Sequence, residues 1–164
     1  MGPLPSGDFV LVVMDEYTRF PFVETIKSTS ANTVIPVLDK LFSLTGFPTI
    51  LKTDNGSPFN SEAFAEFAKY AGFKHRRVTP YWPRANAQAE GFNKPLEKII
   101  RAAHVEKRNW KQEMFKFARQ YRATPHPSTG YSPFFLMFGE DPKTRLPHVK
   151  TQTSYIHDQV REND

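Results

Sequence analysis

The sequence has 164 residues, of which 39% are hydrophobic, so the chain is long enough to bury the core of one globular domain. It contains no Cys, and its five His residues lack zinc-ligand spacing, which excludes disulfides and Cys-based zinc sites. No apolar run is long enough to cross a membrane, and the first residues lack the basic and apolar regions of a signal peptide. The net charge of +5 favours a polyanionic partner.

Apolar periodicity, caps and turn residues predict an alternation of strands and helices. Strands are expected at 8–14, 20–26, 49–54 and 73–79, and helices at 31–45, 62–71, 87–105, 110–124 and 134–138. Strands lead, helices alternate with later strands, and helices close the chain, which predicts an α/β fold with a mixed sheet. Residues 1–139 would form this core, and the polar residues 140–164 a tail.

The first seven residues contain two Pro and two Gly, which predicts a turn. A turn that feeds a covered strand normally follows another strand. We therefore expect the core to lack its own first strand, which would precede Met1.

Two helices are expected to pack on the core through an apolar face. In the long helix these residues are Phe92, Leu96, Ile99 and Ala103. In the helix that follows they are Trp110, Met114, Phe117, Ala118 and Tyr121.

The stretch Ile50–Phe59 contains the most informative carboxylate. An apolar, buried strand is expected to end at Asp54, and the Asn-Gly-Ser-Pro that follows strongly favours a turn. In open α/β sheets, ligands bind beyond the carboxyl ends of the strands, so Asp54 is a candidate metal-binding or acid–base group. Asp54 alone leaves open the alternative that it merely begins a tight turn.

Glu90 shifts the interpretation toward a site. It lies near the start of the long predicted helix, and 35 residues separate it from Asp54. In the absence of Cys, a metal held by such acids would be a hard cation, Mg²⁺ or Mn²⁺.

These residues resemble those of a known family. The matching features are the strand end 53–56, the segment 78–83, the helical Glu90, and the segments 121–126, 129–133 and 138–139. Together they are similar to the catalytic core of retroviral and retrotransposon integrases, above all the Ty3/gypsy type, including copies retained as host genes. The resemblance covers nearly the whole chain.

The resemblance implies a ribonuclease-H-like fold and a function in DNA integration, by Mg²⁺-dependent processing of DNA 3′ ends and strand transfer. Asp54 and Glu90 match two of the three carboxylates that hold the metal ions, and two-metal sites place such ions roughly 3.5–4 Å apart. The implied partners are the element ends, target DNA and, as a further option, a second copy in a homodimer. Access to DNA implies the nucleus.

Asp15 does not match the third carboxylate. It ends a strand and completes a count of three acids, but the family's first Asp lies on the strand before the Gly-Pro-Leu-Pro turn. By that register the first catalytic Asp precedes Met1, and Asp15 is expected to have a structural role.

Basic residues indicate where DNA would lie. Lys94, Lys98 and Arg101 share one face of the long helix, either as a phosphate-binding surface or as an ordinary solvated face. The cluster Lys74–Arg77 is more typical of an exposed edge strand than of a DNA site. In the loop before the helix, Tyr81 resembles the aromatic residue that lies near the DNA end in the family's active-site loop.

Two functions therefore remain open. One is a DNA strand-transferase core that is weak or inactive as this chain alone, because two carboxylates hold paired dications poorly. The other is a non-catalytic remnant of a domesticated retrotransposon integrase that binds nucleic acid or protein. Gly91 and Pro95 favour the second function, since both weaken a helix.

Overall fold

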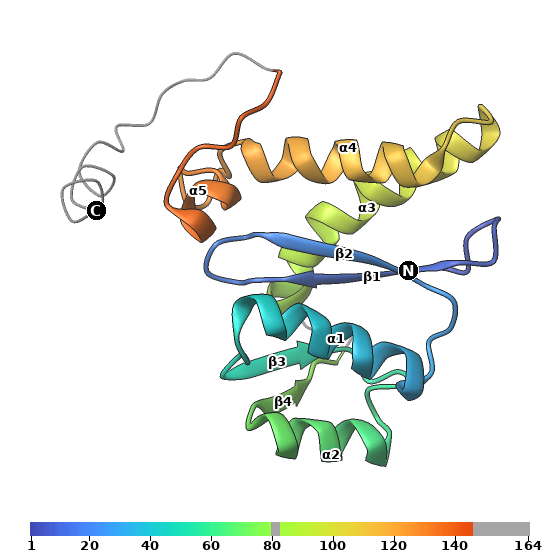
Figure 1. Cartoon of the computed structure of the whole chain (residues 1–164), viewed down its shortest axis with the longest axis vertical. Coiled ribbons are helices and arrows are strands. Elements are labelled where there is room, and N and C mark those ends of the chain that lie inside the picture. The colour runs from blue at the N-terminus through green and yellow to red at the C-terminus, as the bar shows by residue number, and fades with distance from the viewer. Residues whose placement is uncertain (80–82, 146–164) are drawn as a thin grey trace.

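A computed structural model describes the backbone of residues 1–79 and 83–145 and the side chains of residues 1–79 and 91–145. Its elements in chain order are β1 (Phe9–Met14), β2 (Pro21–Ile26), α1 (Ala31–Thr45), β3 (Ile50–Thr53), α2 (Glu62–Ala71), β4 (Lys74–Arg77), α3 (Pro83–Val105), α4 (Trp110–Ala123) and α5 (Pro133–Phe138). This order confirms the predicted succession of strands and helices (Figure 1).

The four strands form two small sheets. β1 and β2 are antiparallel, with Phe9 opposite Ile26, whereas β3 and β4 are parallel, with Ile50 opposite Lys74. Both strand directions occur, as the predicted α/β fold requires. Within the described residues, however, the two pairs do not join into one sheet.

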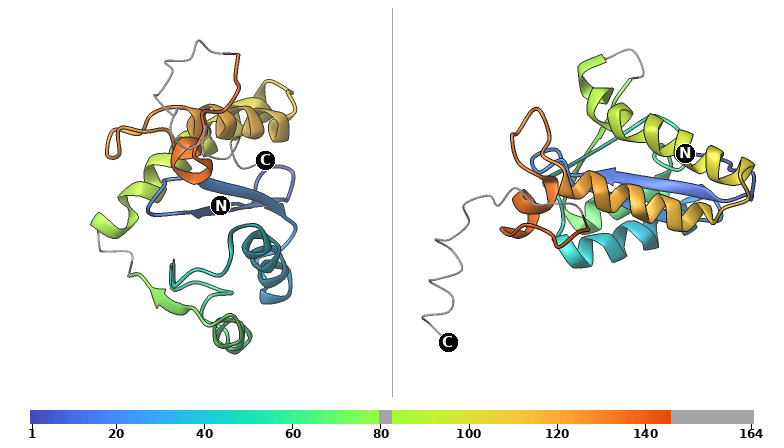
Figure 2. Two further views of the ribbon diagram at one scale, coloured as in Figure 1. Left: turned by 60° about the vertical axis from the view of Figure 1, so that its left-hand side comes forward. Right: turned by 90° about the horizontal axis from the view of Figure 1, so that it is seen from above.

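The β1–β2 hairpin lies between two helical layers, with α3 and α4 on one side and α1 on the other (Figures 1 and 2). Alternate residues of a strand point to opposite faces. Accordingly, Leu11 and Val13 pack on the cluster that contains α1 and α2, and Val10 and Val12 pack on the cluster that contains α3 and α4. The prediction that this strand is apolar on both faces because both are covered is confirmed.

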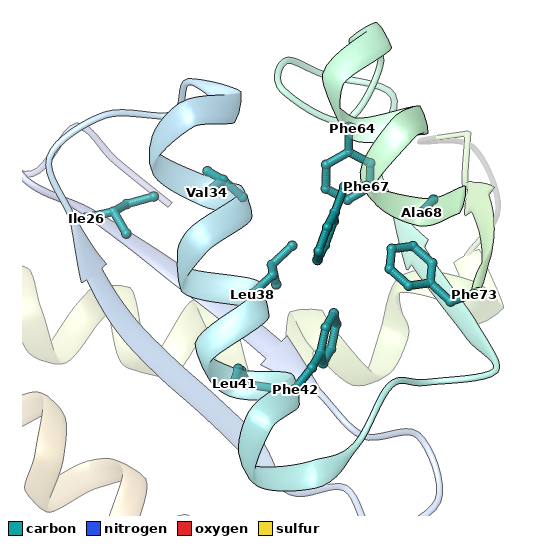
Figure 3. Close-up of a cluster of buried hydrophobic side chains, with 9 residues drawn as sticks. All are labelled: Ile26, Val34, Leu38, Leu41, Phe42, Phe64, Phe67, Ala68 and Phe73. Atoms are coloured by element: carbon teal, nitrogen blue, oxygen red, sulfur yellow. The ribbon is translucent and has the colours of Figure 1, made fainter. Parts of the chain in front are cut away.

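Aromatic rings dominate the first cluster, which Figure 3 shows between α1 and α2. Phe64 is fully buried, and its ring meets Phe67 and Phe73 in edge-on or tilted contacts with centroids 6.0 and 6.4 Å away. Such ring pairs add to the free energy that burial alone contributes. The helix that carries Phe64 begins at Glu62, as predicted, and it is capped by Ser61, whose Oγ accepts a hydrogen bond from the Phe64 N–H at 3.2 Å.

The second cluster lies between the hairpin and α3 with α4. Its buried members include Phe92, Leu96, Ile100 and Ala103 of α3. The expectation that Ile99 belongs to this core was wrong, since Ile99 is only half-buried and Ile100 is buried instead. The predicted apolar face of α4 is confirmed: Trp110, Met114 and Ala118 are buried, and Phe117 and Tyr121 pack beside them.

Arg122 ties α4 to β2. Its guanidinium donates two hydrogen bonds to the carbonyl oxygen of Pro21, at 3.0 and 2.7 Å, and lies over the ring of Phe20. Burial lowers the pKa of Arg122. This residue, one of those that carry the family resemblance, therefore has a structural role.

Two boundary predictions need correction. β3 is not buried, because Ile50 and Lys52 are exposed, and it ends at Thr53, so Asp54 is the first residue after the strand. The long helix begins at Pro83 rather than at 87, because Pro is well suited to a first helical position, where its missing N–H has no intrahelical partner.

Replacing Phe64 by Ala is expected to lower the free energy of unfolding by about 3–5 kcal/mol, since it empties a fully buried ring site. The control is Phe115→Ala on α4, where the side chain is 51% exposed, and it should cost less than about 1 kcal/mol. Urea denaturation of both variants measures these values. Equal losses would show that the aromatic cluster does not hold α2 in place.

Candidate active site

Asp54 lies at the carboxyl end of the β3–β4 pair, where ligands of α/β sheets bind. Its carboxylate is exposed, and Oδ1 accepts a hydrogen bond from the backbone N–H of Gly56 at 3.0 Å. A Cβ at position 56 would lie 3.2 Å from the same oxygen, which is a tight contact. Glycine thus allows the turn to close on the carboxylate, and the exposed group can still coordinate a cation.

A hydrogen-bond chain connects Asp54 to β4. The Thr53 hydroxyl donates to the carbonyl oxygen of Asp54 at 2.8 Å and lies 2.7 Å from Nε2 of His75. Because the hydroxyl has one proton and gives it to the carbonyl, it accepts from Nε2–H of His75. His75 therefore positions the backbone at Asp54.

Sequence reasoning missed this role of His75. The imidazole packs on the ring of Phe64, with centroids 4.8 Å apart, and burial followed by the charge of Arg77 lowers the pKa of His75. The available signal was the alternation along 74–77, which turns every second side chain toward α2. The register between β3 and β4 was also needed, and the sequence does not state it.

Asn55 also contributes to the architecture of the turn, as expected. Its Oδ1 accepts a hydrogen bond from Arg77 at 3.4 Å. The last residue of β4 thus contacts the turn that follows β3, which links both strand ends at Asp54.

The side chains of Glu90 and Tyr81 lie outside the described residues. The backbone places position 90 in α3, as the sequence predicts. The distance between the carboxylates of Asp54 and Glu90 therefore remains a prediction.

The amino group of Met1 provides an electrostatic link between Asp54 and α3. Burial lowers its pKa, and the charges of Asp54 and Glu97 act in the opposite direction, so both carboxylates lie near this group. Position 90 precedes position 97 on α3 by close to two helical turns. Positions 90 and 97 therefore lie on a similar side of the α3 backbone.

The three basic residues predicted to share one face of α3 are exposed, but they differ in their partners. Arg101 forms an ion pair with Glu97 at 2.7 Å, and Lys98 is exposed. Lys94 is exposed as well and takes part in an interaction of its own. The predicted basic face therefore exists on the surface, with Arg101 partly neutralised by Glu97.

Asp15 has the structural role that was expected. Its Oδ2 accepts hydrogen bonds from the backbone N–H and the hydroxyl of Thr18, at 2.8 and 2.7 Å. These bonds close the turn between β1 and β2, so Asp15 serves the hairpin.

Among the residues whose side chains are described, no group of three or more His, Asp or Glu could hold a metal ion. Glu90 is not in that set. Within 1–79 and 83–145, none of the helices has the length and apolar character that crossing a membrane requires.

A family model described as the integrase core domain matches residues 2–83. The chain belongs to the integrase core family. Among curated relatives of this integrase core, an uncharacterised protein of Caenorhabditis elegans is 35% identical over 146 residues, which cover 88% of this chain and 11% of that protein. The Pro-Pol polyprotein of feline foamy virus is 33% identical over 157 residues, which cover 93% of this chain and 13% of the polyprotein. The integrase core thus spans only a small part of these relatives.

Solved structures confirm the ribonuclease-H-like fold. The catalytic core domain of BIV integrase has a TM-score of 0.63 and 16% identity, and the match covers 79% of this chain and 85% of that one. A simian T-cell lymphotropic virus intasome, solved in complex with the PP2A regulatory subunit B56 gamma, has a TM-score of 0.66 and 17% identity. That match covers 85% of this chain and 50% of the other.

The lowered pKa of His75 predicts a loss of stability in acid. Because the unfolded chain binds a proton more readily, the stability that neutral His75 provides is present above its unfolded pKa of about 6.5 and falls below it. The His75→Gln variant should lose less stability than the wild type between about pH 7.5 and about pH 5.5. Thermal unfolding at both pH values measures the difference.

The His75→Gln variant should still lose some stability at acidic pH, because burial also lowers the pKa of His126. Gln keeps an N–H donor for Thr53, so it preserves the hydrogen bond while it removes the titration. An equal pH response in the variant and the wild type would contradict the assignment.

Proposed function

We propose that this integrase core functions in DNA integration, as the polynucleotidyl-transferase unit that processes DNA 3′ ends and joins them to target DNA. The observation that carries the proposal is the exposed carboxylate of Asp54 at the carboxyl end of the β3–β4 pair. It is supported by membership of the family. We further propose an origin in a retrotransposon of the Ty3/gypsy type; the Pro-Pol polyproteins among the relatives support a mobile-element origin.

Asp54 and Glu90 are the residues to which we assign the metal, Mg²⁺ or Mn²⁺. The donor set fits a hard cation, because both groups are carboxylates and the chain has no Cys. Among the described contacts, the Gly56 N–H bonds only to Oδ1 of Asp54, so Oδ2 is left to coordinate the metal. Paired divalent ions in such a site activate the attacking hydroxyl and neutralise the leaving oxygen.

The resemblance calls for a third carboxylate, and we propose that it comes from a strand paired with β1. Met1 already pairs there: its amino group donates to the Val10 carbonyl at 3.0 Å, and the Val10 N–H donates to the Met1 carbonyl at 2.9 Å. Residues joined to Met1 in a longer form would therefore extend along β1 in the antiparallel direction.

DNA is the proposed partner, as element end and as target, and a second copy of the chain would complete the assembly. The proposed DNA contacts are the basic residues Lys94, Lys98 and Arg101, together with Tyr81, which shortly precedes α3 in the sequence. If the protein acts on chromosomal DNA as proposed, its site of action is the nucleus.

The test is strand transfer from a short duplex end into target DNA, measured with this chain and with a form extended upstream. In the active form, Glu90→Gln should lower the rate on the order of a hundredfold or more, as expected for the loss of a group that stabilises transition-state charge. Chelation of divalent ions should have the same effect. The control is Glu106→Gln, which changes an acid in the exposed turn after α3.

Equal rates for Glu90→Gln and the wild type, or no activity in either form, would contradict the enzymatic proposal. Salt-sensitive DNA binding without metal-dependent cleavage would instead favour the non-catalytic remnant.

A further inference from the structure

One face of the β3–β4 pair packs against α2 and the aromatic cluster, and the other face is exposed. On the packed face, Leu51 joins the aromatic cluster and His75 contacts Phe64 of α2. Neighbours in the register point to the same face. Ile50 lies opposite Lys74, and Lys52 lies opposite Arg76, so these four side chains share the other face, which we call the open face.

All four side chains of the open face are exposed. Ile50 is 38% exposed, which is unusual for an apolar residue in a strand. Figure 1 shows α2 beside β4, and this helix covers only the face that carries His75. In the part of the chain whose side chains the structure describes, the open face is thus exposed, and no helix is packed on it.

Three cations lie close together on this face. Neighbouring strands are about 4.8 Å apart, and alternate residues of one strand about 6.6 Å apart, which places Lys52, Lys74 and Arg76 next to one another. Like charges directly opposite each other weaken strand pairing, so the positions of Lys52 and Arg76 oppose the β3–β4 ladder. A polyanion on this face would relieve that repulsion.

Within residues 1–79 and 91–145, ion pairs neutralise only part of this positive charge. Lys52 forms an ion pair with Glu16 at 2.7 Å. Among the described residues, Lys74 and Arg76 have no ion-pair partner. A rigid backbone supports them, since the Lys74 N–H bonds to the Thr49 carbonyl at 2.9 Å.

We propose that the open face binds the sugar-phosphate backbone of duplex DNA and guides the duplex toward Asp54. The partner follows from charge complementarity: an exposed, cationic strand pair matches a polyanion, and only one residue separates Lys52 from Asp54 at the end of β3. This surface extends the DNA contact beyond α3, and it rests on the proposed function. It also revises the expectation for 74–77, because the alternation separates Lys74 and Arg76 from the inward His75.

The test measures binding of a fluorescent duplex to the full chain by anisotropy, in EDTA, over a range of about 50 to 300 mM salt. The variant is Lys74→Gln with Arg76→Gln. Since each lost phosphate contact lowers the slope of log affinity against log salt by about 0.9, the double variant should lower it by roughly 1.8. Affinity at the low-salt end should fall at least about fivefold.

The matched control is Lys69→Gln with Arg119→Gln, which removes the same charge from exposed positions of α2 and α4. It should leave the slope near that of the wild type, and thermal unfolding should show both variants folded. A slope for the Lys74/Arg76 variant equal to that of the control would overturn the inference and leave the proposed function intact. Absence of salt-dependent DNA binding by the wild type would overturn both.

Discussion

The parallel pairing of β3 with β4 is the constraint on which the candidate site depends. It brings Thr53 opposite Arg77 and Leu51 opposite His75, and from this register follow the hydrogen bond between Thr53 and His75 and the contact of Arg77 with Asn55. Both interactions hold the turn that presents Asp54. A slip of one residue would turn each of these side chains to the other face of the strand pair. The geometry of the candidate site therefore depends on this register.

The two hydrophobic clusters explain why this pair stays in place. α2 packs on the face that carries Leu51 and His75, and its ring contacts connect the pair to α1. On the other side of the hairpin, α3 is held by Phe92 and Leu96, both fully buried. The helix that contains position 90 and the strand that precedes Asp54 are thus fixed by separate cores on opposite faces of β1 and β2.

Local signals made much of the fold predictable. The cap at Ser61 and the left-handed Gly72 set the ends of α2, and apolar repeats marked α4. Pairing between strands was less accessible, because the register that exposes Ile50 and buries His75 depends on contacts between distant segments. For the candidate site, turn chemistry pointed to Asp54, which the structure places at the end of β3, whereas Glu90 rests on its spacing within a resemblance and stays a prediction. The role of His75 required the three-dimensional arrangement.

The central claim is that Asp54 and Glu90 together hold divalent metal ions. The most direct measurement is anomalous diffraction from crystals of the protein grown with Mn²⁺. The account predicts Mn²⁺ peaks that contact carboxylate oxygens of both residues, with any second ion roughly 3.5–4 Å from the first. Carboxylates that point apart, or Mn²⁺ bound to neither, would contradict the account.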